Sequence, residues 1–168
     1  TGSTTPMQSL GTLTNSVETT ARFAKQWQDA AGQPITEDRL GFELTVTFQL
    51  QVAVDGTENW EPAGDNAFVR RAMGDGFTDT QTRTGWIHDG SAVWSGSFPG
   101  LPTVVQAGET YTFLQYRVVE TEVTYNGHTQ DIPWDDTAGD YGEITDPGLV
   151  AESDFDRVNN TSTSTNTL

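Results

Sequence analysis

The chain has no cysteine, one lysine and eight basic residues in all, against 24 acidic ones, so its formal net charge is −16 over 168 residues. Without cysteine it can form no disulfide bond and no thiol-based active site. A chain this acidic repels nucleic acid and anionic membranes, and we expect neither as a partner. The sequence also lacks a run of about 18 apolar residues and a charged leader followed by an apolar stretch, so neither a membrane span nor a signal peptide is expected in it.

Motifs for catalysis and cofactor binding are also scarce. The two histidines, His88 and His128, are too few and too far apart in sequence for a zinc site or a catalytic triad. The sequence has no Gly-rich phosphate-binding loop. Nothing in it supplies a convincing nucleophile and base for repeated turnover. We therefore expect no cofactor, no metal centre and no conventional enzyme.

What the sequence does contain is alternation with a period of two. Residues 42–54 place seven apolar side chains at every second position, as in a strand with one buried face. Residues 92–98, ending at Pro99-Gly100, and residues 110–124 are further candidate strands, and no window shows a helical stripe. Several strands separated by turn residues, without helices to support a parallel sheet, predict an all-β fold, an antiparallel β-sandwich.

The length favours one globular domain with appended segments. Residues 1–17, rich in Thr, Ser and Gly, are interpreted as a linker or the end-strand remnant of a preceding domain, with Asn15 on that strand. Residues 18–168 then form the domain, and residues 125–158, dense in Asp, Gly and Pro, are interpreted as an acidic loop insertion. The insertion offers carboxylates that could bind calcium, but their spacing does not match the Asp-x-Asp-x-Asp-Gly loop, and a solvated acidic loop is the alternative. These carboxylates belong to Asp135, Asp136, Asp140, Glu143 and Asp146.

The single lysine, Lys25, stands in an unusual position. In an extended chain Phe23, Lys25 and Trp27 share one face, and the two aromatic side chains direct that face inward. A buried ammonium is costly unless it is paired or loses its proton. Desolvation also lowers the pKa of a lysine and makes its neutral amine a nucleophile. A surface lysine in a lysine-poor protein is the simpler alternative.

Two other polar residues are directed toward the interior by the same alternation. Glu120 shares a face with two apolar residues of the strand at 110–124, and Asn166 lies on one face of a final alternating segment. If the first and last strands are neighbours, Lys25, Glu120 and Asn166 can meet. The ordinary alternatives are a buried ion pair between Lys25 and Glu120, and a polar residue near a strand end at Asn166.

Four short motifs follow one another along residues 20–168: Lys25-Gln26-Trp27, Phe98-Pro99-Gly100-Leu101-Pro102, Tyr116-Arg117-Val118-Val119-Glu120 and Thr165-Asn166-Thr167. In order and placement they resemble the Cna protein B-type (CnaB) domains of Gram-positive surface adhesins and pilins. The resemblance implies an inverse immunoglobulin-like, transthyretin-like β-sandwich with an intramolecular isopeptide bond. By motif position, Lys25 would supply the amine, Asn166 the carboxamide carbon and Glu120 the catalytic carboxyl group.

The reaction that this resemblance implies is one self-modification of each molecule. The neutral amine of Lys25 attacks the side-chain carbonyl of Asn166, which Glu120 polarises as a carboxylic acid, and ammonia leaves. Asn159 and Asn160 remain rival acceptors, because the acidic insertion lies between Glu120 and the last strand and makes that strand's assignment less direct.

The resemblance also implies a function, that of a structural stalk or pilin module. Such a module lies on the outside of a Gram-positive cell, anchored to its wall, with neighbouring domains of the same surface protein as partners. The alternative is an adhesin module that binds a host protein or glycan through residues 59–86 or 125–158. Tryptophans that are exposed and clustered would favour the adhesin alternative, whereas buried tryptophans would favour the stalk. The tryptophans that could line such a binding platform are Trp60, Trp86, Trp94 and Trp134.

Overall fold

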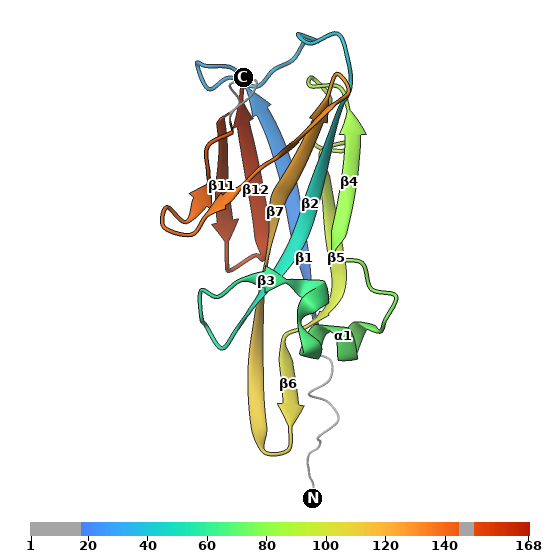
Figure 1. Cartoon of the computed structure of the whole chain (residues 1–168), viewed down its shortest axis with the longest axis vertical. Helices are drawn as coiled ribbons and strands as arrows, with labels where there is room; N and C mark the ends of the chain where they lie inside the picture. Colours follow the sequence, from blue (N-terminus) through green and yellow to red (C-terminus); the bar gives the residue numbers. More distant parts are fainter. Residues whose placement is uncertain (1–17, 145–149) are drawn as a thin grey trace, which may run out of the picture.

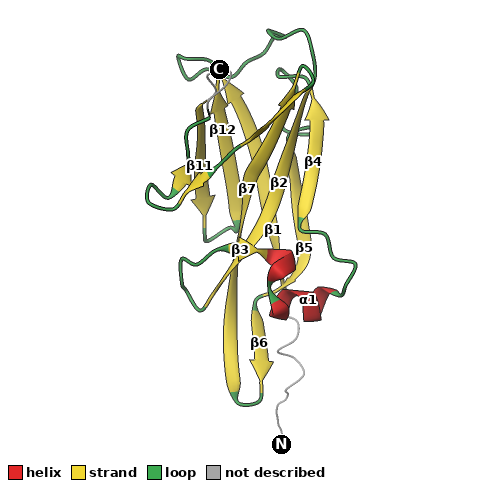
Figure 2. Cartoon of the chain, in the orientation of Figure 1, coloured by secondary structure: helices red, strands yellow, loops and turns green. Residues whose placement is uncertain are grey.

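The computed structural model describes residues 18–144 and 150–168, which form two facing β-sheets (Figure 1). Strands dominate the chain and helical structure is confined to a short region in the lower half of the view (Figure 2), so the predicted all-β sandwich is confirmed. The first sheet has the order β11 (Val150–Asp156), β12 (Thr161–Thr167), β1 (Glu18–Gln28) and β5 (Ser95–Pro102).

The second sheet is built on two long strands, β2 (Leu44–Val54) and β7 (Thr110–Tyr125). Short strands cover their outer edges: β3 (Glu61–Pro62) and β4 (Thr80–Gly85) pair with β2, while β6 (Val104–Ala107) and β8 (His128–Asp131) pair with β7. A separate ribbon contains β9 (Trp134–Asp135) and β10 (Asp140–Tyr141), and η3 (Ala63–Asp65) precedes α1 (Ala67–Met73).

The first and last strands are direct neighbours. β1 and β12 run parallel, with Lys25 opposite Ser164 and Trp27 opposite Asn166. The other strand pairs within the described ranges are antiparallel, so this pair is the exception to the predicted antiparallel arrangement. Because the two strands point the same way, the start of β1 and the end of β12 lie at opposite ends of the sheet (Figure 1).

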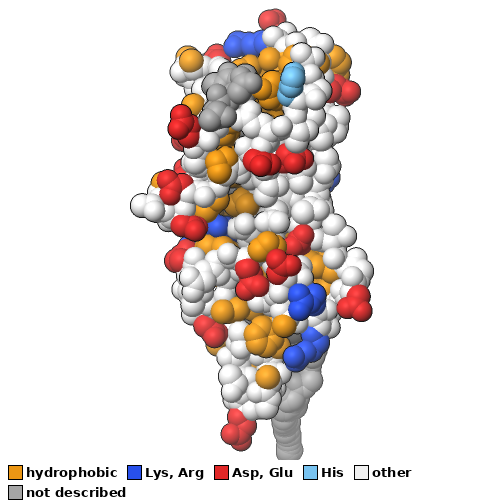
Figure 3. All heavy atoms as spheres, in the orientation of Figure 1, with side chains coloured by type: hydrophobic (Ala, Val, Ile, Leu, Met, Phe, Trp, Pro, Cys, Tyr) orange, Lys and Arg blue, Asp and Glu red, His pale blue; other side chains and the backbone are white. Residues whose placement is uncertain are grey.

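The core lies between the sheets and follows the alternation of the sequence. In β2 the side chains of Leu44, Val46, Phe48, Leu50 and Val52 are all buried, as predicted. The outer surface is polar, and Figure 3 shows acidic side chains spread along the face in view, with fewer basic ones. Among the residues that the structure describes, no helix is long and apolar enough to cross a membrane.

The prediction that the chain has no helix is wrong for α1. The side chain of Asn66 accepts hydrogen bonds from the backbone N–H groups of Phe68 and Val69 and caps the helix. The helix ends at Gly74, whose φ of 89° suits glycine. Seven residues are too few for an amphipathic stripe, so capping is the sequence signal for this helix.

The expected strand end at Pro99-Gly100 is also wrong, because β5 continues to Pro102. The pairing of β1 with β5 shifts register between Thr19 and Ala21, and Gly100 adopts a φ of 70° at that irregularity. A bulge of this kind absorbs an extra residue without ending the ladder.

The acidic loop insertion over residues 125–158 needs correction as well. β8 pairs with the end of β7, and β11 pairs with β12 along seven residues, so β11 is an edge strand of the first sheet. Glu152, Asp154 and Asp156 on β11 are exposed. Polar, charged side chains are typical of sheet edges and conceal the apolar alternation that identifies a central strand.

Candidate functional site

Lys25 lies where its strand was expected to place it. It is 3% exposed, on the inward face of β1 between Phe23 and Trp27. Its Nζ atom lies 4.0 Å from the centre of the Trp27 ring and forms an ion pair with Glu120 Oε1. The simpler interpretation of Lys25 as a surface residue is therefore wrong.

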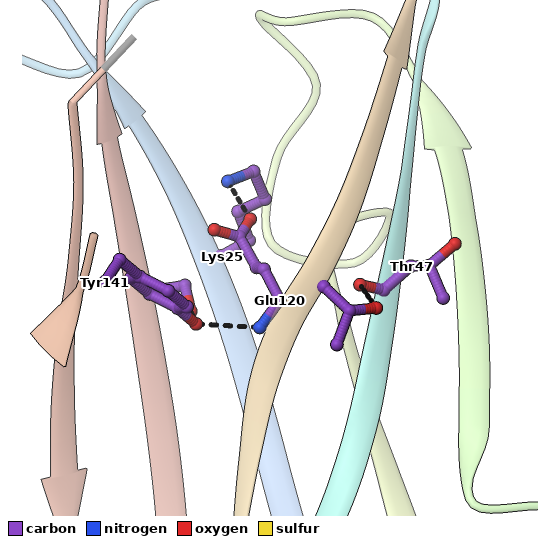
Figure 4. A network of polar contacts seen from close by, with 6 residues as sticks. Lys25, Thr47, Glu120 and Tyr141 are labelled. Carbon is purple, nitrogen blue, oxygen red and sulfur yellow. Dashed lines mark hydrogen bonds and ion pairs between the residues drawn. The ribbon is translucent and has the colours of Figure 1, made fainter. Parts of the chain in front are cut away.

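Glu120 reaches this lysine from the opposite sheet. It lies in β7 and is 1% exposed, and Figure 4 shows its carboxyl group pointing toward the amine of Lys25. The pairing of β7 with β2 shifts register beside it, because Phe48 pairs with Glu120 whereas Thr47 pairs with Glu122. The extra residue, Thr121, makes a bulge, and bulges commonly redirect neighbouring side chains.

Asn166 lies on the inward face of β12 with no exposed surface. Its strand partner is Trp27, so it is displaced by two residues from the partner of Lys25. Strand spacing of about 4.8 Å and a rise of about 3.3 Å per residue put the Cα atoms of Lys25 and Asn166 about 8 Å apart. A lysine side chain spans that diagonal. The condition that the first and last strands be neighbours is therefore met.

Unpaired polar atoms gather at this place. In residues 18–144 and 150–168, the buried side-chain atoms without a hydrogen-bond partner are Trp27 Nε1, Glu120 Oε2, and Nδ2 and Oδ1 of Asn166. Buried polar groups are almost always hydrogen-bonded, so each exception needs a reason. Here all of them belong to the cluster around Lys25, and both polar atoms of the Asn166 amide are among them.

Burial also sets the protonation of the lysine. It lowers the pKa of Lys25 to about 8, because the ammonium is removed from water, while the charge and hydrogen bond of Glu120 act in the opposite direction. A neutral amine is therefore accessible near neutral pH.

The rival acceptors lie elsewhere. Asn159 is exposed and donates from its side chain to Asp156 in the turn before β12. Asn160 donates from its side chain to the backbone oxygen of Thr20. Lys25 pairs with Ser164, four residues beyond Asn160, and at about 3.3 Å per residue that places Asn160 about 13 Å along the strand.

The acidic residues of 125–158 that the structure describes are not arranged as a metal site. Within the described ranges, no group of three or more His, Cys, Asp or Glu side chains could hold a metal ion. Asp135 accepts hydrogen bonds from the backbone of Thr137 and Ala138, and Asp140 accepts from Tyr141 and Ser153. Asp146 lies outside the described residues, as does Asn15.

The four tryptophans considered for a binding platform form two pairs: Trp94 donates from its indole to the backbone oxygen of Trp86, and Trp60 and Trp134 both contact Arg117. Trp94 is buried, and Trp86 is exposed beside His88. Trp60 and Trp134 are half-buried and stack on the guanidinium of Arg117 at 4.5 Å and 4.1 Å.

Sequence reasoning missed two residues of the site, Tyr141 and Ser164. The hydroxyl of Tyr141 accepts the backbone N–H of Glu120 at 2.7 Å (Figure 4). It also lies 2.6 Å from Ser164 Oγ. Ser164 alternates with Asn166 and could have been found by the argument that selected Asn166. Tyr141 comes from a two-residue strand, which carries no periodicity.

Comparisons with family models, with curated proteins and with solved structures give no match to this chain. Its function is therefore inferred from the residues of the site.

Proposed function

We propose that this chain is a structural stalk or pilin module of a bacterial surface adhesin, locked by an intramolecular isopeptide bond between Lys25 and Asn166. The proposal includes an inverse immunoglobulin-like CnaB fold, a place on the wall of a Gram-positive cell, and neighbouring domains of the same protein as partners. The observation that carries it is the buried cluster itself. A lysine of lowered pKa is paired with a carboxyl group, and an amide without hydrogen bonds lies buried on the neighbouring strand, two residues from the strand partner of that lysine.

The chemistry balances without a cofactor. A proton passes from Lys25 Nζ to Glu120, and the amine lone pair attacks Cγ of Asn166. As a carboxylic acid, Glu120 hydrogen-bonds to the carbonyl oxygen and then gives its proton to Nδ2, which leaves as ammonia, while the second proton of the attacking nitrogen passes to Glu120. One C–N bond forms and one breaks, so an amine and a carboxamide give a secondary amide and NH₃. The fold supplies proximity and orientation, and each molecule reacts once.

The position of this bond suits a protein under tension. A pulling force enters β1 at its start and leaves β12 at its end, and these points lie at opposite ends of two parallel neighbours. Such a force shears β1 against β12. A bond from Lys25 to Asn166 passes the load directly from one strand to the other, so the chain between them carries none of it.

The tryptophans support the stalk over the alternative of a glycan-binding or protein-binding adhesin module. A sugar-binding platform needs free aromatic faces that share one surface. Trp94 is buried, and Trp60 and Trp134 each present a ring face to Arg117. The edge contacts of these two rings with Phe155 and Tyr141 fix them further in the fold.

The test is the intact mass of the folded protein. The wild type is expected to weigh about 17 Da less than its sequence requires, because ammonia is lost. Lys25→Ala and Asn166→Ala variants should show the full sequence mass, while Asn160→Ala should still show the deficit. A folded wild type with the full mass sinks the proposal.

A further inference from the structure

The hydroxyl of Tyr141 ties together the two strands that carry the acid and the acceptor. It accepts the backbone N–H of Glu120 on β7 and is hydrogen-bonded to Ser164 Oγ on β12. Ser164 is the strand partner of Lys25 and stands two residues before Asn166 on the same inward face. One phenol from β10 therefore contacts both sides of the candidate site.

This bridge lies at a gap in the second sheet. β6 pairs with β7 as far as Phe113, and β8 pairs with it from Glu122, so among the residues that the structure describes no strand pairs with this edge of β7 between them. On this edge the backbone N–H of Val118 donates to Ser162 Oγ, and that of Glu120 donates to Tyr141 Oη. A buried N–H without a partner is costly, so these hydroxyls fix how β7 lies against β12.

The phenol keeps its proton over the working pH range. Burial raises the pKa of Tyr141 well above its usual value, and the charge of Glu120 acts in the same direction. The charged groups around it are Glu120 with its partner Lys25, the guanidinium of Arg117, and the adjacent Asp140, whose carboxylate accepts backbone N–H groups. A group that stays neutral next to a proton-transferring pair is suited to holding geometry rather than to carrying the proton.

We infer that Tyr141, acting with Ser164, is a positioning residue for cross-link formation, which holds Glu120 and the Asn166 strand in register across the gap between the two sheets. The inference rests on the proposed isopeptide bond. It assigns a task to the ribbon at residues 134–141, which the amino-acid pattern alone identifies only as part of a loop. The hydrogen bonds of Tyr141 reach neither Lys25 Nζ nor the side-chain amide of Asn166, so Tyr141 acts on how Glu120 and the Asn166 strand are placed.

The experiment follows the formation of the isopeptide bond, here called closure, in the full chain. Protein recovered unfolded from inclusion bodies is diluted from urea, and the fraction that has lost ammonia is measured by intact mass at a series of pH values, with folding followed by circular dichroism. Tyr141→Phe should fold and then close about tenfold more slowly than the wild type. Tyr111→Phe, which changes an exposed tyrosine of β7, is the matched control and should close at the wild-type rate.

The pH profile separates positioning from a loss of folded protein. Glu120 raises the pKa of Lys25, so this pKa should fall if Glu120 moves away from Lys25. The high-pH limit, which is the pH above which bond formation slows because the Lys25–Glu120 pair loses its proton, should therefore be lower in Tyr141→Phe. A rate and a limit equal to the wild type, or a slower rate with an unmoved limit, would overturn the inference. A wild type that never loses ammonia refutes the isopeptide proposal itself, and the inference falls with it.

Ser164→Ala provides a second route if Tyr141→Phe does not fold. It removes the other end of the bridge from a different strand and should also slow closure about tenfold. The double variant should be no slower than the slower single variant, because both remove the same bridge. Independent, multiplying effects would contradict a shared role.

Discussion

Removing the acceptor amide, by Asn166→Ala, isolates the energetic contribution of the cross-link. The variant cannot form the bond, so it keeps the Lys25–Glu120 ion pair of the unreacted chain, and it breaks no hydrogen bond of the Asn166 side chain, because neither polar atom of that side chain has a partner. The remaining local cost is a small cavity, worth about 1 kcal/mol. Any larger loss of stability therefore belongs to the bond.

The size of that loss follows from the loop that the bond closes. From Lys25 to Asn166 the loop spans 166 minus 25, or 141, residue steps. The chain-entropy model for cross-links gives about 5 kcal/mol for a loop of this length. With the cavity, Asn166→Ala should lose about 6 kcal/mol of unfolding free energy. For a domain of this size that corresponds to a fall of about 12–24 °C in Tm.

The assay is equilibrium unfolding in guanidinium chloride, followed by the fluorescence of the buried Trp27 and Trp94, with calorimetric scans for Tm. Asn160→Ala is the matched control and should lose only about 1 kcal/mol for its side-chain hydrogen bonds to Thr19 and Thr20. Equal, small losses in both variants would refute the reasoning. A larger loss in Asn160→Ala would move the acceptor to that residue.

Three further predictions concern the acid, the lysine and the aromatic stack. Glu120→Gln keeps the shape of the side chain but removes the acid, and we expect a folded protein of full sequence mass; a mass deficit in it contradicts the assigned role. The reactive Lys25–Glu120 pair holds one proton, which folded Lys25 loses at a pKa of about 8, below its usual 10.5. The rate of isopeptide-bond formation, measured by timed intact mass, should therefore fall above about pH 8. A rate that rises there would show that ionised Glu120 suffices. Arg117→Lys keeps a charge between Trp60 and Trp134 but loses the planar group that stacks on their rings. Unfolding in guanidinium chloride should show a loss of about 1–2 kcal/mol in the free energy of unfolding, while the protein keeps its mass deficit. Unchanged stability would argue against the stack.

The parts of the site that the sequence predicts are those governed by local alternation. Lys25, Glu120 and Asn166 each lie in a strand long enough for the period of two to identify an inward face, and all three are buried. The pattern alone could not establish that β1 and β12 are neighbours or that they are parallel. Those features depend on contacts between residues about 140 positions apart.

The parts that the sequence does not predict are short or lie at sheet edges. Tyr141 belongs to a two-residue strand, whose position depends on packing against Trp134 and on the hydrogen bonds of Asp140. The polar edge strand β11 has no clean apolar alternation, and α1 is too short for a helical stripe. In each case tertiary contacts, rather than periodicity, determine the structure.

A tryptic peptide map of the folded protein tests the central claim most directly. Trypsin does not cleave after an acylated lysine, so the account predicts that residues 23–39 remain one peptide, joined to residues 158–168 with a mass about 17 Da below the sum of the two. Fragmentation of this species should place the bond at Asn166 rather than at Asn159 or Asn160. Cleavage after Lys25, with residues 158–168 recovered separately and unmodified, would contradict the account.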